Sequence, residues 1–219
     1  MRLSLVSSML LIGLLSAGCN PDDDEPATPA GNGGGGGGGN TTITATTVES
    51  VTFTQDGTTR TYTSGANNVG IVFSNSGSSG STSTKNYGCS FYNTVTDDTY
   101  IEFILGDFEQ AGFGIPSEEL FFGWFSTGEV DYSTGESQVE KAEVMMNDGA
   151  PLYTQWSSRC GAQSGESFNV TQVVQIPGGF SYDKVKYRVT FNCKLYNCNT
   201  SAVRTITNGT AVVLVESNI

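Results

Sequence analysis

The alternation of apolar and polar residues over 185–195 constrains the fold of this chain more than any other feature. Apolar side chains occupy every second position, and Lys, Arg, Thr or Asn occupy the positions between them. Because successive side chains of a β-strand point to opposite faces, this period of two indicates a strand with one buried and one solvated face. From residue 45 onward no stretch sustains the three-to-four-residue spacing of an amphipathic helix. The chain is therefore expected to be built from strands.

Turn signals divide the rest of this region into short strands. Asp56-Gly57, Asp148-Gly149 and Asn208-Gly209 each separate two strand-like segments, since these dipeptides tolerate the positive φ of tight hairpin turns. Besides 185–195, we expect strands near 51–53, 60–62, 71–74, 87–92, 100–105, 120–125, 139–146, 152–156, 168–176, 203–206 and 210–215, with a Ser/Gly-rich loop over 74–84. Such a pattern predicts an all-β sandwich or barrel. We expect an antiparallel β-sandwich, immunoglobulin-like or jelly-roll-like, as a single domain over 45–219.

The N-terminal segment has the layout of a secretory signal. Arg2 supplies a positive charge, residues 3–15 are mostly apolar, and small residues precede Cys19. The apolar run is shorter than the roughly 20 residues that span a bilayer as a helix. Residues 15–19, Leu-Ser-Ala-Gly-Cys, resemble the lipobox of bacterial lipoproteins, with Ser16 at the position where leucine is commonest. The resemblance implies that 1–18 are a signal peptide and that Cys19 becomes a lipidated N-terminus.

Residues 19–44 are expected to form a tether behind that lipid anchor. The acidic run Asp22 to Glu25 resembles the export signal that follows the lipidated cysteine in surface lipoproteins of the Bacteroidota. This resemblance implies an outer-membrane protein that is exposed on the cell surface. The run Gly33 to Gly39 has no Cβ atoms to restrict its backbone, so it is expected to be a flexible spacer.

A second resemblance concerns the domain itself. Residues 191–196 and 207–210 look like the closing hairpin of small, largely uncharacterised β-sandwich lipoproteins of the Bacteroidota, and 53–57 look like an opening hairpin of the same group. This resemblance favours the β-sandwich fold. It implies no particular activity, because that group has no common chemistry.

Cysteine content favours disulfides over a metal site. With Cys19 assigned to lipid, the cysteines that remain are Cys89, Cys160, Cys193 and Cys198. An even number in an exported protein predicts two disulfides, and the spacing leaves all three connectivities open. Four thiolates can also bind zinc, but the chain contains neither a Cys-x-x-Cys pair nor any histidine.

The absence of histidine also excludes Ser-His-Asp and Cys-His catalysis. Carboxylates remain as possible catalytic groups, as in glycosidases, which use two of them at a defined separation. The acids considered for this role are Glu102, Asp107, Glu109, Glu118 and Glu119. No cofactor is expected, except that loop carboxylates could hold a structural calcium ion. The calcium candidates are Asp97, Asp98, Asp107 and Asp131.

The aromatic segment 120–125 has two interpretations. Apolar residues occupy both faces of the expected strand, which is typical of a central strand buried on both sides. Alternatively, its rings form an exposed platform that stacks on sugar rings or anchors a partner protein. The residues considered for this platform are Phe121, Trp124, Phe125, Tyr132, Tyr153 and Trp156.

Net charge narrows the choice of partner. A net charge of −12 opposes binding to nucleic acid. The local exception is a basic stripe expected on the solvated face of one strand, formed by Lys184, Lys186, Arg188 and Lys194. The sequence favours a non-catalytic binding or adhesion module, anchored to the outer membrane, that engages an extracellular glycan or protein. The alternatives are a carboxylate-dependent glycan hydrolase and a structural envelope protein.

Overall fold

All strand pairings are antiparallel in the computed structural model, which describes residues 41–77, 82–96, 99–112, 114–134, 141–148, 154–179 and 181–218. The strands in this part of the chain are β1 (Ser50–Gln55), β2 (Thr58–Thr63), β3 (Val69–Gly77), β4 (Thr82–Asn93), β5 (Thr99–Ala111), β6 (Gly128–Glu129), β7 (Lys141–Asn147), β8 (Gln155–Ser157), β9 (Ser167–Ile176), β10 (Lys184–Asn197) and β11 (Val203–Glu216). They form one hydrogen-bonded sheet in the order β2-β1-β11-β10-β8-β7-β5-β4-β3, with β9 paired to β10 and to β6. The predicted all-β, antiparallel fold class is confirmed.

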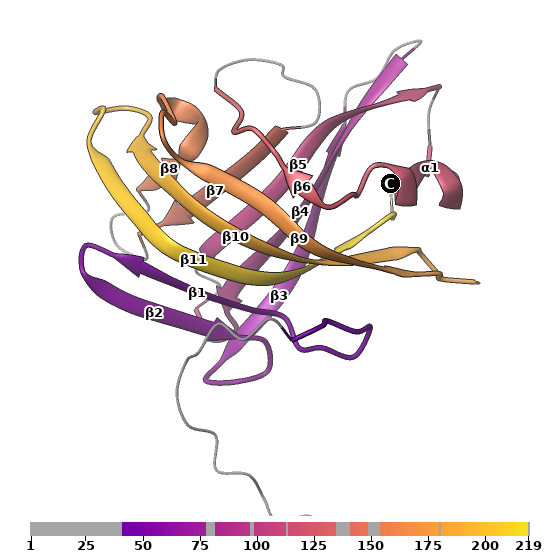
Figure 1. The fold of residues 1–219 in the computed structure, drawn as a ribbon, viewed down its shortest axis with the longest axis horizontal. Coiled ribbons are helices and arrows are strands. Elements are labelled where there is room, and N and C mark those ends of the chain that lie inside the picture. The colour runs from indigo at the N-terminus through magenta and orange to yellow at the C-terminus, as the bar shows by residue number, and fades with distance from the viewer. Residues whose placement is uncertain are drawn as a thin grey trace, which may run out of the picture. The chain divides into compact units, whose positions relative to one another are not determined.

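The sheet curves strongly around its core (Figure 1). Inward side chains of β5 and β10 meet across that core, where the rings of Phe103 and Phe191 have centroids 5.1 Å apart. The described residues belong to one compact unit, Gly38–Ile219. Figure 1 also shows two distinct ends: the β1–β2 and β10–β11 hairpins lie at one, and the helix α1 (Glu118–Gly123) lies at the other.

A stacked tyrosine pair joins two parts of the sheet that are not paired as strands. Tyr62 of β2 stacks on Tyr100 of β5, with ring centroids 4.4 Å apart and ring planes 10° apart. The register between β4 and β5 shifts at this point. Phe91 pairs with Ile101, but the next residue, Tyr92, pairs with Thr99. Tyr100 is therefore the extra residue of a β-bulge, a feature that bends a strand locally.

The strongest strand and turn signals are confirmed. The alternating segment 185–195 lies within β10, where Val185, Val189 and Cys193 are fully buried. The β1–β2 hairpin turns at Asp56 and Gly57, whose φ angles are +50° and +76°. Glycine adopts this region freely, which explains why the Asp-Gly dipeptide marks the turn.

Two local predictions are wrong. Asn208 and Gly209 do not form a hairpin turn, because β11 runs through them; the register against β10 shifts between Phe191 and Cys193, which indicates a β-bulge at this point. Asn208 has a φ of +54°, so it does adopt the positive φ that the Asn-Gly dipeptide predicts, but within a β-bulge and not within a hairpin turn. The expected loop over 74–84 is also too long, since β3 extends to Gly77 and β4 begins at Thr82.

The predicted central strand over 120–125 is wrong as well, since α1 occupies most of it. The Ser117 side chain accepts a hydrogen bond from the N–H of Leu120 at 3.3 Å and caps the helix N-terminus. Glu118 and Glu119 occupy the first turn, where the helix dipole favours negative charge. The helix buries Phe121 against the core residue Tyr87, with ring centroids 5.2 Å apart.

The segment 43–49 packs against the outer face of the sheet and covers Lys186. The Lys186 ammonium forms an ion pair with Glu49 at 2.8 Å and donates hydrogen bonds to the carbonyls of Ala45 and Thr47. The N–H of Ile43 donates to Oε1 of Gln172 on β9 at 2.7 Å. Lys186 is consequently buried, with 4% of its side chain exposed, and the expected solvated basic stripe is interrupted at its centre.

One disulfide, Cys160–Cys198, joins the short 3₁₀ turn η1 (Ser158–Cys160) to the turn between β10 and β11. The expectation of a second disulfide is wrong, because Cys89 and Cys193 are free thiols buried in the core. Burial raises the pKa of the Cys89 thiol to about 12 and also raises that of Cys193. Both thiols are therefore protonated and unreactive at neutral pH.

Candidate functional site

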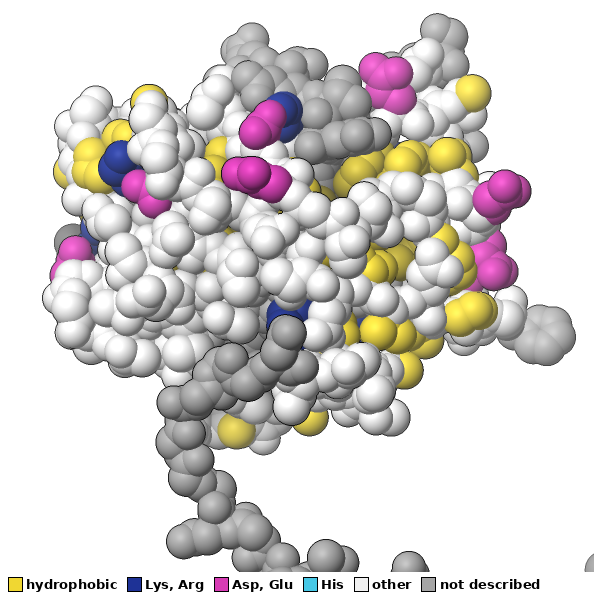
Figure 2. Space-filling view, in the orientation of Figure 1, with side chains coloured by type: hydrophobic (Ala, Val, Ile, Leu, Met, Phe, Trp, Pro, Cys, Tyr) yellow, Lys and Arg dark blue, Asp and Glu magenta, His cyan; other side chains and the backbone are white. Residues whose placement is uncertain are grey.

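A cavity of about 460 Å³ opens at the α1 end of the sheet. We call it the aromatic cavity; its lining residues are Leu105, Phe108, Trp124, Phe125, Ser126, Glu129, Val130, Asp131, Lys141, Val170 and Tyr187. In Figure 2, hydrophobic side chains gather on the right-hand side of the molecule, where α1 lies in Figure 1. A volume in this range suits a small ligand or one unit of a larger one.

Aromatic rings form the floor of the aromatic cavity. Trp124, which ends α1, stacks on Phe108 of β5 with ring centroids 5.2 Å apart and planes 15° apart. Phe125 lies 5.5 Å from Phe108 and 6.2 Å from Tyr187 of β10, and these three residues are buried. Trp124 is half-buried. The packed rings fix its indole at the cavity wall while part of it stays accessible.

Polar residues surround the mouth of this cavity. Asp131 forms an ion pair with Lys141 at 2.6 Å, and 77% of the Asp131 side chain is exposed. Glu129 of β6 and Ser126 are also exposed. The aromatic cavity thus combines an apolar floor with a rim of carboxylate, ammonium and hydroxyl groups, which can form hydrogen bonds with a polar ligand.

The structure places the aromatic residues selected from the sequence in different parts of the molecule. Trp124 and Phe125 line the aromatic cavity, whereas Phe121 lies in the core. Tyr132 is also buried, and its hydroxyl lies 3.0 Å from the carbonyl of Asn192 as a hydrogen-bond donor. Trp156 is buried near the opposite end, and Tyr153 lies outside the described residues. These positions do not form the expected exposed aromatic platform.

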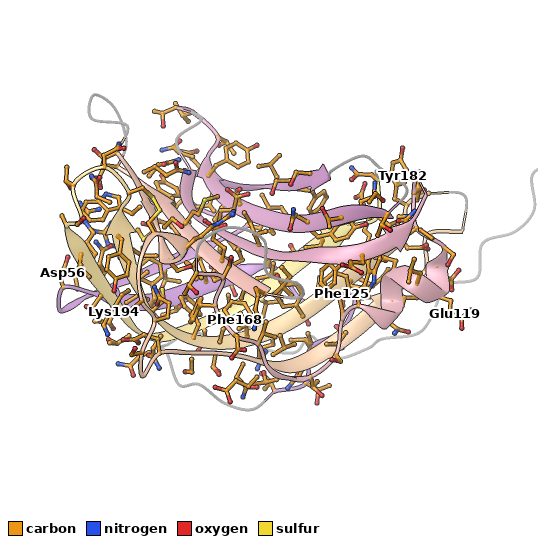
Figure 3. All side chains as sticks on the ribbon, turned by 90° about the horizontal axis from the view of Figure 1, so that it is seen from above. Asp56, Glu119, Phe125, Phe168, Tyr182 and Lys194 are labelled. Carbon is orange, nitrogen blue, oxygen red and sulfur yellow. A yellow bond between two sulfur atoms is a disulfide. The ribbon has the colours of Figure 1, made fainter. Side chains whose placement is uncertain are left out.

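A second hollow of about 350 Å³ lies near the β1–β2 turn. We call it the arginine cleft; its lining residues are Gln55, Asp56, Arg60, Tyr62, Tyr100, Met146, Asn147, Asp148 and Arg204. Figure 3 shows Asp56 of the arginine cleft and Phe125 of the aromatic cavity toward opposite ends of the molecule. None of these residues was predicted as a site residue from the sequence, although Arg60 and Tyr62 are alternate residues beside a predicted turn and therefore share a strand face.

Asp148 is held in the arginine cleft by three hydrogen bonds. Arg204 donates to both carboxylate oxygens, at 2.6 and 3.0 Å, and Nε1 of Trp156 donates at 3.0 Å. The Arg204 guanidinium also lies 3.8 Å from the centre of the Trp156 ring, a cation–π contact. The hydrogen bonds from Arg204 lower the pKa of Asp148, with smaller contributions from Trp156 and from the charge of Arg60.

The acids considered for catalysis or calcium do not converge in the described part of the chain. Glu102 accepts a hydrogen bond from Ser74 at 2.6 Å, and Glu118 and Glu119 lie exposed in α1. Within the described residues, no group of three or more Cys, Asp or Glu side chains is placed to hold a metal ion. Asp97, Asp98 and the side chain of Asp107 lie outside that description, as does Cys19.

In the part of the chain that the structure describes, no helix has the length and apolar character needed to cross a bilayer. Comparison with protein-family models, curated proteins and solved structures found no match.

Proposed function

We propose that this chain is a lipid-anchored protein of the outer-membrane surface, whose β-domain is a non-catalytic module that binds an extracellular glycan. The aromatic cavity would hold one sugar unit. The observation that carries this proposal is the half-buried Trp124, which is fixed by its stack on Phe108 next to an exposed polar rim. The finer fold class proposed with it is a β-sandwich, in which Phe103 and Phe191 would pack between the two layers.

The chemistry of the aromatic cavity suits a sugar. One face of a pyranose ring carries C–H groups, which pack on a flat aromatic surface such as an indole. Sugar hydroxyls both donate and accept hydrogen bonds, and the rim supplies Glu129, Asp131 and Ser126 as acceptors with Lys141 as a donor. A protein partner would need a larger apolar surface than this concave site offers.

The first prediction concerns Trp124. Replacing it by alanine is expected to weaken binding of the best glycan on an array by about tenfold or more, because aromatic anchors in pockets contribute the largest share of binding energy. The matched control is Tyr182→Ala, which removes an exposed ring outside the cavity and should leave the affinity unchanged. Calorimetry with the full-length chain in detergent gives the affinities. No glycan binding by the wild-type chain, or equal losses in both variants, would contradict the proposal.

The second prediction concerns the anchor. Cys19→Ser is expected to abolish incorporation of labelled palmitate and to release the protein from the membrane fraction, since the lipobox resemblance implies that the lipid is attached at Cys19, first as a thioether to its sulfur. Cys89→Ser is the control, because that cysteine is buried in the core. Cys19→Ser protein that still incorporates labelled palmitate and remains in the membrane fraction would contradict lipidation at Cys19. Protease treatment of intact cells tests the proposed surface exposure separately.

One observation favours a second candidate, the carboxylate-dependent glycan hydrolase. Glu129 and Asp131 both line the aromatic cavity and are two residues apart in the chain. A glycosidase acid, however, requires a desolvated carboxyl group, whereas both of these are exposed. Binding without hydrolysis is therefore our proposal. Reducing ends released from the bound glycan, and lost in Glu129→Gln, would favour the hydrolase.

A further inference from the structure

We propose that the arginine cleft binds a free α-amino acid with an aromatic side chain, as the zwitterion. This second site lies apart from the aromatic cavity and does not depend on glycan binding there (Figure 3). Three features of the cleft carry the proposal: an unsatisfied buried acceptor beside a carboxylate, an arginine whose guanidinium has no hydrogen bond or ion pair among the described residues, and a stacked tyrosine pair that lines the same cleft.

The acceptor is the side-chain amide of Gln55. Only 4% of Gln55 is exposed, and its Oε1 has no hydrogen-bond partner among the described residues. A buried acceptor without a hydrogen bond is destabilising, so a ligand that donates a hydrogen bond here gains more than it would at a solvated group. The Gln55 Nε2 lies 3.4 Å from Oδ2 of the exposed Asp56, which places a carboxylate beside the amide. An ammonium group, with three N–H donors and a positive charge, matches both groups.

The arginine is Arg60, which follows Gln55 across the β1–β2 hairpin. Gln55 pairs with Thr58 and Phe53 pairs with Arg60, so Gln55 and Arg60 are diagonal neighbours on the same face of the hairpin. The Arg60 side chain is exposed, and its guanidinium has no hydrogen bond or ion pair within the described part of the chain. Asp148, the nearby carboxylate, is already held by Arg204 and Trp156. The Arg60 guanidinium therefore remains available for a bidentate contact with a ligand carboxylate.

The rest of the cleft suits an aromatic side chain. The stacked rings of Tyr62 and Tyr100, together with Met146, line the space beside these polar groups. Aromatic rings pack against such surfaces in offset or edge-on contacts. The charges also agree with a zwitterion, because the cleft contains two arginines and two aspartates. A protein with a net charge of −12 repels a simple anion but not a ligand without net charge.

The test is calorimetric titration of the full-length chain in detergent with L-phenylalanine, N-acetyl-L-phenylalanine and L-phenylalanine amide. The two derivatives remove the ammonium and the carboxylate in turn. Saturable binding of phenylalanine is expected, with each derivative binding about tenfold more weakly or worse, because each loses charge-assisted hydrogen bonds. Arg60→Gln should weaken phenylalanine binding to a similar extent but leave the weak binding of the amide unchanged. Asp56→Asn, which can keep the positive φ of the turn, should also weaken phenylalanine binding.

Lys141→Gln is the matched control, because it removes the same charge at the aromatic cavity and should not change phenylalanine binding. Circular dichroism melts confirm that each variant is folded. The proposal is overturned if phenylalanine does not bind, if the derivatives bind as well as phenylalanine does, or if Arg60→Gln has no effect. It is also overturned if Trp124→Ala abolishes phenylalanine binding, since the ligand would then occupy the aromatic cavity. None of these outcomes bears on the glycan experiment.

Discussion

Lys186→Ala is expected to lower the free energy of unfolding by about 3–5 kcal/mol, because removing one member of a buried ion pair leaves the other charge uncompensated. Lys186 and Glu49 have 4% and 13% of their side chains exposed, and the same ammonium also satisfies two backbone carbonyls. Urea denaturation followed by circular dichroism measures this change.

Lys184→Ala supplies the control two residues away on the same strand. Lys184 pairs with Glu216 at 3.0 Å, but 36% of its side chain is exposed, so its loss should cost no more than about 1 kcal/mol. The double replacement Lys186→Met with Glu49→Leu removes both buried charges and is expected to recover much of the stability that Lys186→Ala loses. A loss in Lys186→Ala no larger than that in Lys184→Ala would show that the pair is solvated.

The double variant Cys160→Ser with Cys198→Ser is expected to lose about 4 kcal/mol of unfolding free energy, by the chain-entropy relation for a loop of this size. The disulfide closes a loop between residues 38 positions apart, so the unfolded chain gains conformational freedom when the bond is absent. Thermal and urea unfolding under non-reducing conditions measure the difference.

Reduction of the wild-type protein provides the control for the disulfide prediction. Dithiothreitol should destabilise the wild type by about the same amount and leave the double variant unchanged. Cys89 and Cys193 contribute no disulfide, so a reductant has no other described target. A change below about 1 kcal/mol in the double variant would mean that the bond does not constrain the unfolded chain.

Residue patterns within each segment predicted most of the strands, but they did not predict which other segments of the chain pack over those strands. The alternation in β10 identified the strand, and it also placed Lys186 on the polar face. Lys186 is nevertheless buried, because Ala45 and its neighbours, about 140 residues earlier in the chain, fold over that face. No periodicity within β10 carries this information. The helix α1 was missed for a different reason: the apolar run 120–125 outweighed the cap at Ser117, which the sequence does contain.

The candidate sites were partly visible in the sequence. Trp124 and Phe125 were selected because aromatic residues cluster there, and both line the aromatic cavity. Phe108 and Tyr187 complete its floor from β5 and β10, and only the curvature of the sheet brings these strands together. In the arginine cleft, Arg60 and Arg204 looked like ordinary strand residues. Their convergence in this cleft depends on strand register, which a single sequence does not specify.

The packing of 43–49 against β9 and β10 has a mechanical consequence for a domain held by its N-terminus. Drag on the domain would load the chain at Thr41, the first described residue. That load would first meet the hydrogen bonds that join Thr41 and Ile43 to Gln172, and then the buried Lys186 contacts, before it reached β1. If Cys19 anchors the chain as proposed, the contacts of 43–49 would bear this force before the β1–β11 pairing does, and β1 would start to separate from β11 only after they had failed.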